Sequence, residues 1–478
     1  MCPMTLHIPF DNTYARLPDR LFVAQDPTPV AAPRLIAFNN ALADDLGIDG
    51  PRDEAELARV FSGNEVPEGA NPLAQLYSGH QFGHWNPQLG DGRAILLGEA
   101  RTPAGRFDIQ LKGAGRTPYS RGGDGRAWLG PVLREYVLSE AMHALGIPTT
   151  RALAATETGE RVVRDAAMPG AVLTRVAASH IRVGTFQVLA ARRDEEGLKA
   201  LYDHAVERHY PGAKDPVQFL DAVIARQARL VAQWMGVGFI HGVMNTDNCS
   251  IAGETIDYGP CAFLDDYHPM TVFSSIDRQG RYAYANQPDI LVWNMAQLAT
   301  ALVPLMPDTD TAVEQFTALI HAMPARIEAH WREIFRAKIG LSSEEEGDHA
   351  LITSLLELMA QQGADFTNTF RALATGTAPR DQFTDRDTFD AWAEGWQARL
   401  AREQGDPQAL MRAASPALIP RNHRVEQMIQ AAVAGDYAPF ERLMQALAAP
   451  YDDPEDTFAD LTRPPAEGEH VRQTFCGT

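Results

Sequence analysis

The chain has 478 residues, 45% of them hydrophobic and 22% charged, with a formal net charge of −20. This composition is that of a globular protein with more than one lobe, and the acidic balance argues against nucleic acid or an anionic membrane as a partner. The sequence has no apolar run of about 18 residues, no secretory leader and no CxxC pair among its four cysteines. We therefore expect a cytoplasmic protein without a membrane helix, a disulfide framework or a structural zinc site.

The first part of the chain is predicted to be rich in strands. Residues 1–75 are expected to form an N-terminal segment packed on the main body, and residues 76–183 a β-rich lobe. Strands are expected in AILLGEA (94–100), FDIQLKG (107–113) and AVLTRVA (171–177). One helix is expected in GPVLREYVLSEAMHALG (130–146), because Leu133, Val137 and Ala141 form an apolar stripe that ends at Gly146.

From residue 184 onward the chain is predicted to be largely helical. Two long helical patterns cover residues 215–240 and residues 316–340, and SSEEEGD (342–348) is expected to be a solvated loop. We assign residues 184–290 to a helical lobe and residues 291–478 to a helical C-terminal region. The predicted fold class is therefore α+β.

The stretch IHGVMNTDNCSIAGETIDYG (240–259) follows the pattern of the catalytic and metal loops of a protein kinase, H-R-D-x-x-x-x-N followed by D-F-G. His241, Asn248 and Asp257 match that pattern, but Val243 stands where a kinase has its catalytic aspartate. The pattern predicts a kinase-like bilobal fold. Asn248 and Asp257 are candidate ligands for magnesium on a nucleotide, since Mg²⁺ prefers oxygen ligands. The alternative is that both are ordinary turn residues.

Lys112 ends an expected strand, and Glu135 lies on the helix that follows. Glu135 shares a helical face with Leu138 and Met142, so we expect it to be partly buried and to need a cation. The two residues fit the lysine–glutamate ion pair that holds a kinase lysine on phosphate. The alternative is that both side chains are solvated at the surface.

Two glycine-rich loops flank Lys112 and are candidate phosphate cradles. The first contains Gly90, Gly92 and Arg93, and the second contains Asp124 and Gly125. Arg175 and Arg182 follow later in the chain, and together with Arg93 and Lys112 they would form a basic pocket if the fold brought them together. The alternatives are common glycine turns and ordinary surface arginines.

His80 and His84 have the i,i+4 spacing that two metal ligands can have on a helix. Nearby glycine and proline argue against a helix there, and no H-E-x-x-H motif is present. We expect both to be packed or hydrogen-bonded structural histidines.

Several longer motifs, YSGHQFG, PQLGDGRA, LKGAGRTPYSRGGDGRA, HGVMNTDNCSI and DYGPCAFLDDY, together resemble those of the selenoprotein O (SelO) family over nearly the whole chain. The resemblance implies a kinase-like protein adenylyltransferase that binds ATP in a flipped orientation. Such an enzyme would transfer AMP to Ser, Thr or Tyr hydroxyls of protein substrates and release pyrophosphate. Manganese-dependent UMP transfer is implied as a side activity.

The resemblance also implies roles for individual residues. Asp247 would be the general base, and Asn248 and Asp257 would hold Mg²⁺ or Mn²⁺. Glu135 would pair with Lys112, and near the C-terminus Cys476 would have a redox role, with Cys261 as its expected disulfide partner. The expected ATP-binding residues are Gly90, Gly92, Arg93, Lys112, Asp124, Gly125, Arg175 and Arg182.

Two other functions remain open at the level of sequence. One is an ordinary kinase that transfers the γ-phosphate, and the other is a noncatalytic nucleotide-binding scaffold, which Val243 favours. Against a scaffold stand Lys112, Asp247, Asn248 and Asp257, because these residue types are those that turnover of a metal-bound nucleotide requires.

Overall fold

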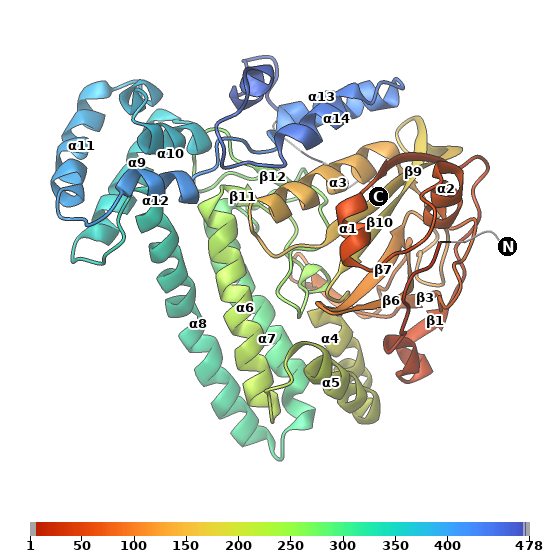
Figure 1. The fold of residues 1–478 in the computed structure, drawn as a ribbon. Helices are drawn as coiled ribbons and strands as arrows, with labels where there is room; N and C mark the ends of the chain where they lie inside the picture. Colours follow the sequence, from red (N-terminus) through yellow and green to blue (C-terminus); the bar gives the residue numbers. More distant parts are fainter. Residues whose placement is uncertain (1–5, 472–473, 475–478) are drawn as a thin grey trace.

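The computed structural model describes residues 6–471 and residue 474, and it confirms the α+β class. A β-rich lobe lies at the right of Figure 1 and helices fill the rest, an arrangement consistent with a kinase-like fold. Within the described residues the main sheet has eight strands in the order β1-β3-β6-β7-β10-β9-β2, with β8 paired to β10. These strands are β1 (Phe22–Ala24), β2 (Arg34–Phe38), β3 (Leu73–Gln75), β6 (Ala94–Thr102), β7 (Gly105–Lys112), β8 (Ala127–Trp128), β9 (Arg151–Val163) and β10 (Ala167–Ala177).

The centre of this sheet positions Lys112. Antiparallel pairing places Lys112 at the end of β7, opposite Ala94 of β6 on one side and Leu173 of β10 on the other. The three predicted strands correspond to β6, β7 and β10. Behind them, α1 (Asn40–Asp45) and α2 (Glu54–Ser62) share an apolar core with the sheet. The first 75 residues therefore supply strands and helices to the lobe, while the predicted domain boundaries stay predictions.

The predicted helix after the second glycine loop is α3 (Leu129–Ala144), which packs on β9 and β10. Its apolar stripe is buried, and so is Glu135. Two helices from the far end of the chain, α13 (Asn422–Val433) and α14 (Ala438–Ala446), lie over α3 and share its core (Figure 1). Sequence patterns did not predict this contact, because it joins segments nearly 300 residues apart.

The helical lobe holds the two loops of the kinase-like motif. Its helices are α4 (Val183–Arg192), α5 (Glu195–His209), α6 (Pro216–Gly236), α7 (Gln287–Leu302) and α8 (Thr309–Lys338). Asp215 caps α6 by accepting from the backbone N–H of Gln218 (2.8 Å), and Pro216 takes the first turn, where no N–H is needed. After α6, the short strands β11 (Phe239–Ile240) and β12 (Ala262–Phe263) pair and bracket both loops.

The remaining helices form a separate apolar cluster at the upper left of Figure 1. They are α9 (Asp348–Gln362), α10 (Phe366–Thr375), α11 (Arg386–Leu400) and α12 (Pro407–Ala414). The predicted solvated loop SSEEEGD lies before α9 except for its last residue, Asp348, which begins the helix and is buried. Among the described residues, no helix combines the length and the hydropathy that a membrane span requires.

Candidate active site

A cavity of about 770 Å³ lies where the β-rich lobe meets the helical lobe. Its lining joins residues from the sheet, both glycine loops, α3, both motif loops and the C-terminal segment. Every nucleotide, metal and base candidate named from the sequence lines this one cavity: Gly90, Gly92, Arg93, Lys112, Asp124, Gly125, Glu135, Arg175, Arg182, Asp247, Asn248 and Asp257. The fold therefore brings together residues that are up to 167 positions apart (257 − 90 = 167).

The loop that contains Val243 is anchored by its neighbours. His241 is buried, which lowers its pKa, and its Nε2 donates to the carbonyl of Ile256 (2.8 Å). The side-chain amide of Asn248 donates to the carbonyl of Val243 (3.0 Å). Because the amide nitrogen is engaged in this way, the Oδ1 of Asn248 is left as an acceptor for a cation.

Asp257 is the carboxylate around which the basic side chains gather. It accepts from Lys112 Nζ (3.1 Å) and from the guanidinium groups of Arg175 and Arg182. Burial opposes ionisation of this group, but Arg175, Arg182 and Lys112 outweigh that effect and hold the pKa of Asp257 well below its ordinary value. Its φ of 60° is unusual for a residue other than glycine, and these ion pairs help to maintain it.

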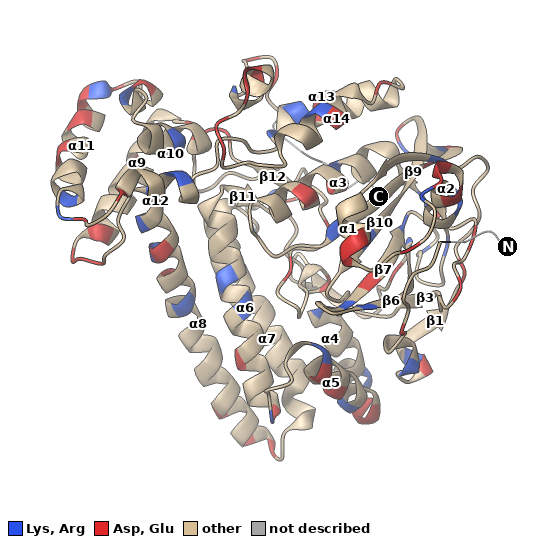
Figure 2. Ribbon diagram, in the orientation of Figure 1, with Lys and Arg blue, Asp and Glu red and all other residues tan. Residues whose placement is uncertain are grey.

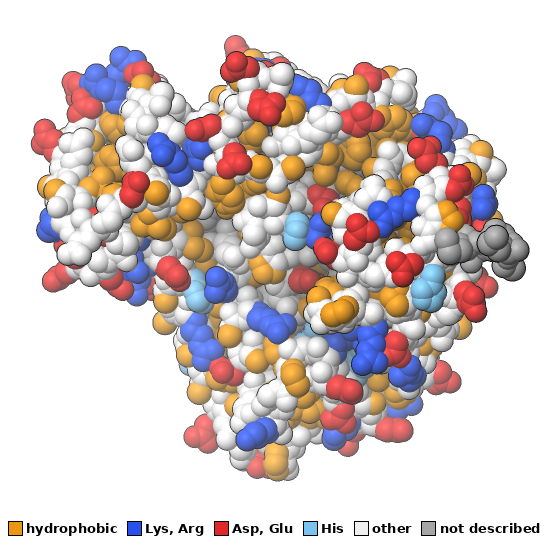
Figure 3. Space-filling view, viewed as in Figure 1, with side chains coloured by type: hydrophobic (Ala, Val, Ile, Leu, Met, Phe, Trp, Pro, Cys, Tyr) orange, Lys and Arg blue, Asp and Glu red, His pale blue; other side chains and the backbone are white. Residues whose placement is uncertain are grey.

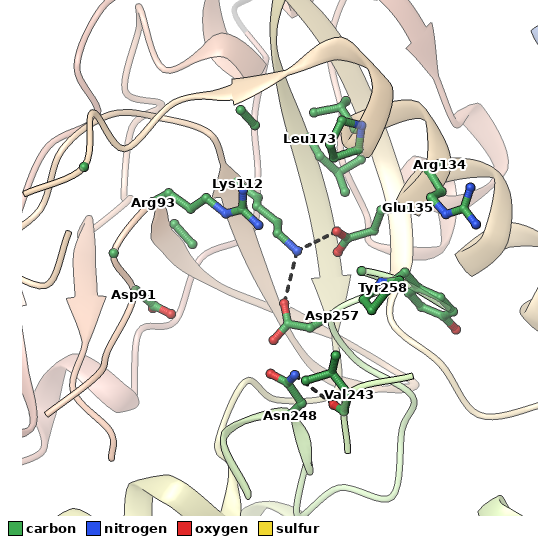
Figure 4. A pocket seen from close by; sticks show the side chains of 18 of the residues that line it. Asp91, Arg93, Lys112, Arg134, Glu135, Leu173, Val243, Asn248, Asp257 and Tyr258 are labelled. Atoms are coloured by element: carbon green, nitrogen blue, oxygen red, sulfur yellow. Dashed lines mark hydrogen bonds and ion pairs between the residues drawn. The ribbon is translucent and has the colours of Figure 1, made fainter. Parts of the chain in front are cut away.

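Lys112 bridges Asp257 and Glu135, as Figure 4 shows. Its Nζ lies 2.5 Å from Glu135 Oε2, and Arg175 Nη1 lies 3.3 Å from Glu135 Oε1. The Glu135 side chain is only 4% exposed, so its charge depends on these two cations rather than on water. The pairing orients Lys112 across the cavity from β7 toward Asp257.

Asp247 lies in a single 3₁₀ turn, Thr246–Asn248. Burial raises the pKa of its carboxyl group to about 6, although the charge of Arg182 acts in the opposite direction. Oδ2 accepts from the side-chain amide of Gln81 (3.1 Å), and the Asp247 carbonyl accepts from Arg182 Nη1 (2.6 Å). The residue is thus an organised carboxylate in the cavity wall, four positions after Val243.

Both glycine loops require close backbone packing. A Cβ on Gly90 would lie 2.6 Å from the Tyr119 ring, and one on Gly125 would lie 2.1 Å from the carbonyl oxygen of Gly115. Gly125 also has a φ of 68°, which favours glycine. At the outer edge of the cavity, Asp124 forms an ion pair with Arg164 (2.8 Å).

The residue between the first two glycines, Asp91, was missed by sequence reasoning. It is buried and accepts from the backbone N–H of Gln75 (3.1 Å) and the side chain of Gln110 (3.0 Å), which ties the loop to β7. Burial raises its pKa to about 6. The signal that could have found it is G-D-G itself, since an aspartate flanked by glycines often organises a turn.

The two histidines do not lie on a helix. They lie on the hairpin formed by β4 (Gly79–Gln81) and β5 (His84–Asn86). His80 Nδ1 accepts from the side-chain amide of Gln187 (3.1 Å), and the ring packs on Trp85, as expected for a structural histidine. His84 was expected to be packed or hydrogen-bonded; it is exposed and therefore not packed, because the open side of the hairpin faces solvent.

Cys476 lies outside the described residues, so the expected Cys261–Cys476 disulfide stays a prediction. Cys261 is buried. Thr474 lies at the wall of the cavity, and its hydroxyl donates to the carbonyl of Pro260 (2.6 Å), the residue before Cys261. At Thr474 the C-terminal segment therefore runs beside the loop that contains Asp257 and Pro260.

The basic lining contrasts with the rest of the protein. The net charge is −20, and Figure 2 shows acidic and basic residues interspersed along the elements. The face in Figure 3 is a similar mixture, without a broad basic field. Arg93, Lys112, Arg175 and Arg182 nevertheless line one cavity, so basic side chains are gathered there although the protein as a whole is acidic.

A β-rich lobe and a helical lobe meet at a cavity with a lysine–glutamate pair, an asparagine and an aspartate suited to a metal, and no carboxylate at position 243. These features define the class as a nucleotide-dependent transferase with a kinase-like fold. The family described as "Protein adenylyltransferase SelO" matches residues 4–448, and the chain belongs to this family.

Similar proteins include three bacterial relatives, each named "Protein nucleotidyltransferase YdiU". The chain is 67% identical to that of Ruegeria pomeroyi over 476 residues, which cover 99% of this chain and 100% of the relative. It is 64% identical to that of Roseobacter denitrificans, with the same coverage, and 58% identical to that of Methylorubrum extorquens, with 99% and 100% coverage. The protein is therefore a nucleotidyltransferase with a nucleotide substrate.

Proposed function

We propose that the protein transfers AMP from ATP to Ser, Thr or Tyr hydroxyls of other proteins, with ATP bound in the flipped orientation. The observation that supports this most directly is the position of the carboxylates. Position 243 has no acid, and Asp247 lies in the cavity wall beside Asn248 and Arg182. A base displaced from the kinase position suits a reacting phosphorus that is also displaced, as the α-phosphorus is in the flipped pose.

In the proposed reaction, the substrate hydroxyl oxygen forms a bond to the α-phosphorus. The bond from that phosphorus to the oxygen bridging to the β-phosphorus breaks, and pyrophosphate leaves with the electron pair. Asp247 accepts the hydroxyl proton. The pKa of its carboxyl group, raised by burial to about 6, leaves it largely ionised at neutral pH and more basic than an exposed aspartate.

The terminal phosphates are proposed to bind the cations that gather at Asp257. Lys112, Arg175 and Arg182 point at one carboxylate from three elements and are mostly or fully buried. Charges held in place inside a cavity stabilise a polyphosphate with little reorganisation. Arg93 and the glycines of both loops would contact the remainder of the nucleotide.

The donors present fit Mg²⁺ or Mn²⁺. Asn248 presents an amide oxygen and Asp257 a carboxylate. Among the described residues no group of three or more His, Cys, Asp or Glu could hold a metal by itself, and a nucleotide-bound Mg²⁺ needs only one or two protein ligands. When bound, the ion would neutralise phosphate charge.

Two labelled ATPs test the proposal. The protein is incubated with Mg²⁺, reductant and a mixed protein substrate, with label on the α-phosphate in one tube and on the γ-phosphate in the other. We expect protein label from the α tube alone. Label from the γ tube alone would make the protein a kinase, and no label from either would favour a scaffold.

The role of Asp247 is tested in the same assay. Asp247→Ala should abolish transfer of the α-phosphate label to protein (α-label transfer). Asp203→Ala, which removes an exposed carboxylate on α5, should leave this transfer unchanged. Full transfer by Asp247→Ala would remove the base assignment without affecting the choice between α and γ label.

A further inference from the structure

The hairpin β4–β5 precedes most of the sheet in sequence but lies against the loop that contains Asp247. Consecutive residues of the hairpin contact consecutive residues of that loop. The His80 N–H donates to Thr246 Oγ1 (2.7 Å), and the Gln81 side chain donates to Asp247 Oδ2 (3.1 Å). The Phe82 N–H donates to the side-chain oxygen of Asn245 (3.0 Å).

The start of the hairpin is fitted closely to Asp247. A Cβ on Gly79 would lie 2.6 Å from Asp247 Oδ1, so a side chain there would displace the carboxylate. Just before it, the Ser78 N–H donates to the carbonyl of Gly184 on α4 (3.1 Å). A Cβ on Gly184 would lie 2.0 Å from the Ser78 carbonyl oxygen, so backbone meets backbone at this point. The hairpin therefore has little freedom to move relative to the helical lobe.

Aromatic contacts hold the hairpin from the other side. The Phe82 ring packs edge-on against Tyr282, with ring centroids 5.1 Å apart. The Tyr282 hydroxyl donates to Asn245 (2.6 Å), so Asn245 is shared between the hairpin and Tyr282. His80 packs edge-on against Trp293 of α7, at 5.2 Å. These contacts brace the residues on both sides of Gln81.

The backbone of Gln81 is therefore fixed in place, and its side-chain amide reaches the carboxylate of Asp247. The Oδ1 of Asp247 is buried and has no hydrogen-bond partner among the described residues, while Oδ2 is held by Gln81. The carboxylate could otherwise rotate about χ2, and its approach to a substrate hydroxyl depends on that angle. A neutral amide orients it without adding another charge beside the phosphates.

We propose that Gln81 is a positioning residue for Asp247, and that the β4–β5 hairpin clamps the loop holding the base. Gln81 acts through Asp247, so this inference rests on the proposed function, in which Asp247 is the base. Loss of the Gln81 amide should slow the transfer step. It should leave nucleotide binding unchanged, because the ion pairs of Lys112, Arg175 and Arg182 with Asp257 do not involve Gln81.

The test is Gln81→Met, which keeps the length of the side chain and removes the donor. We expect kcat for α-label transfer to fall about 10–100-fold, the range for losing a hydrogen bond to a charged group, with KM for ATP within about twofold of wild type. Gln88→Met makes the same change at an exposed position of the same segment and should have no effect.

The outcomes are separable. Unchanged kcat in Gln81→Met would overturn the positioning role, and so would a raised KM for ATP with kcat retained, which would make Gln81 a nucleotide contact. Gln81→Glu serves as a second variant if the methionine variant does not fold. Its carboxylate would repel Asp247, so kcat should fall at unchanged KM, and wild-type kcat would likewise refute the inference. Retained transfer in Asp247→Ala would instead contradict the proposed function.

Discussion

Asp257→Asn tests how much of the stability of the cavity comes from the carboxylate that Lys112, Arg175 and Arg182 share. In the wild type, Asp257 accepts from Lys112 Nζ at 3.1 Å and from Arg175 and Arg182. Asparagine keeps the shape but removes the charge that these cations share. Lys112 and Arg175 would keep their ion pairs with Glu135. Within the described residues, the Arg182 guanidinium would keep only one hydrogen bond, the one to the carbonyl of Asp247.

The expected effect on stability follows from burial. Removing one partner of a buried ion pair costs about 3–5 kcal/mol, because it leaves an uncompensated buried charge. Unfolding entropy of about 2.1 cal/mol/K per residue amounts to about 1 kcal/mol/K for a chain of this length. The melting temperature of the variant without nucleotide should therefore fall by about 3–5 °C.

Thermal unfolding is measured without ligand, with pyrophosphate and EDTA, and with MgATP. Pyrophosphate should stabilise Asp257→Asn more than the wild type, because its charge replaces the missing carboxylate. MgATP should stabilise the variant less than the wild type, and α-label transfer should be lost, because a proposed metal ligand is gone. Asp310→Asn, an exposed change at the start of α8, is the control. A wild-type melting temperature with retained transfer would refute this account of the cavity.

Three further predictions concern other parts of the molecule. Glu135→Gln should lower kcat/KM for ATP about 10–100-fold, because a hydrogen bond from a cation to this buried carboxylate contributes about 1.5–3 kcal/mol. A kcat/KM within twofold of wild type in steady-state kinetics would contradict this. Gly125→Ala should weaken ATP binding, measured by calorimetry, and destabilise the fold by about 1–3 kcal/mol. The new Cβ would lie 2.1 Å from the Gly115 carbonyl oxygen, and residue 125 has a φ of 68°. An unchanged affinity for ATP would show that the loop can move. Burial lowers the pKa of His204 to about 4 and that of His209 to about 3. Below pH 6.5 these two histidines therefore bind protons in the unfolded chain but not in the folded protein. Stability in denaturant titrations should then fall between pH 6.5 and pH 4 by about 1 kcal/mol per pH unit for each histidine, and His204→Gln should reduce that slope.

Much of the local structure could be predicted from the sequence. The apolar runs of β6, β7 and β10 and the helical stripe of α3 are local patterns, because backbone geometry imposes a period on side chains that face a core. The spacing of His241, Asn248 and Asp257 was equally visible, since the two loops follow one another in the chain. The same pattern showed that position 243 lacks the acid of a kinase.

Other features could not be predicted, because they join distant segments without a periodic signal. Gln81 and Asp247 are 166 residues apart, and neither stands in a local pattern that names the other. Arg134 on α3 forms an ion pair with Glu426 on α13 (2.9 Å) across 292 residues, which brings the C-terminal region onto the cavity wall. His84 was expected to be packed or hydrogen-bonded, but the placement of the hairpin leaves it exposed.

The sequence by itself determined which residues have chemistry suited to a metal-bound nucleotide, because residue type and short spacing are properties of the chain. The tertiary structure decided which of them act on one another. Lys112, Arg175 and Arg182 become one cluster of cations only when β7, β10 and the start of α4 converge on Asp257. The physical reason is that charges interact through space, over a few ångströms, and the fold alone determines which charges lie that close.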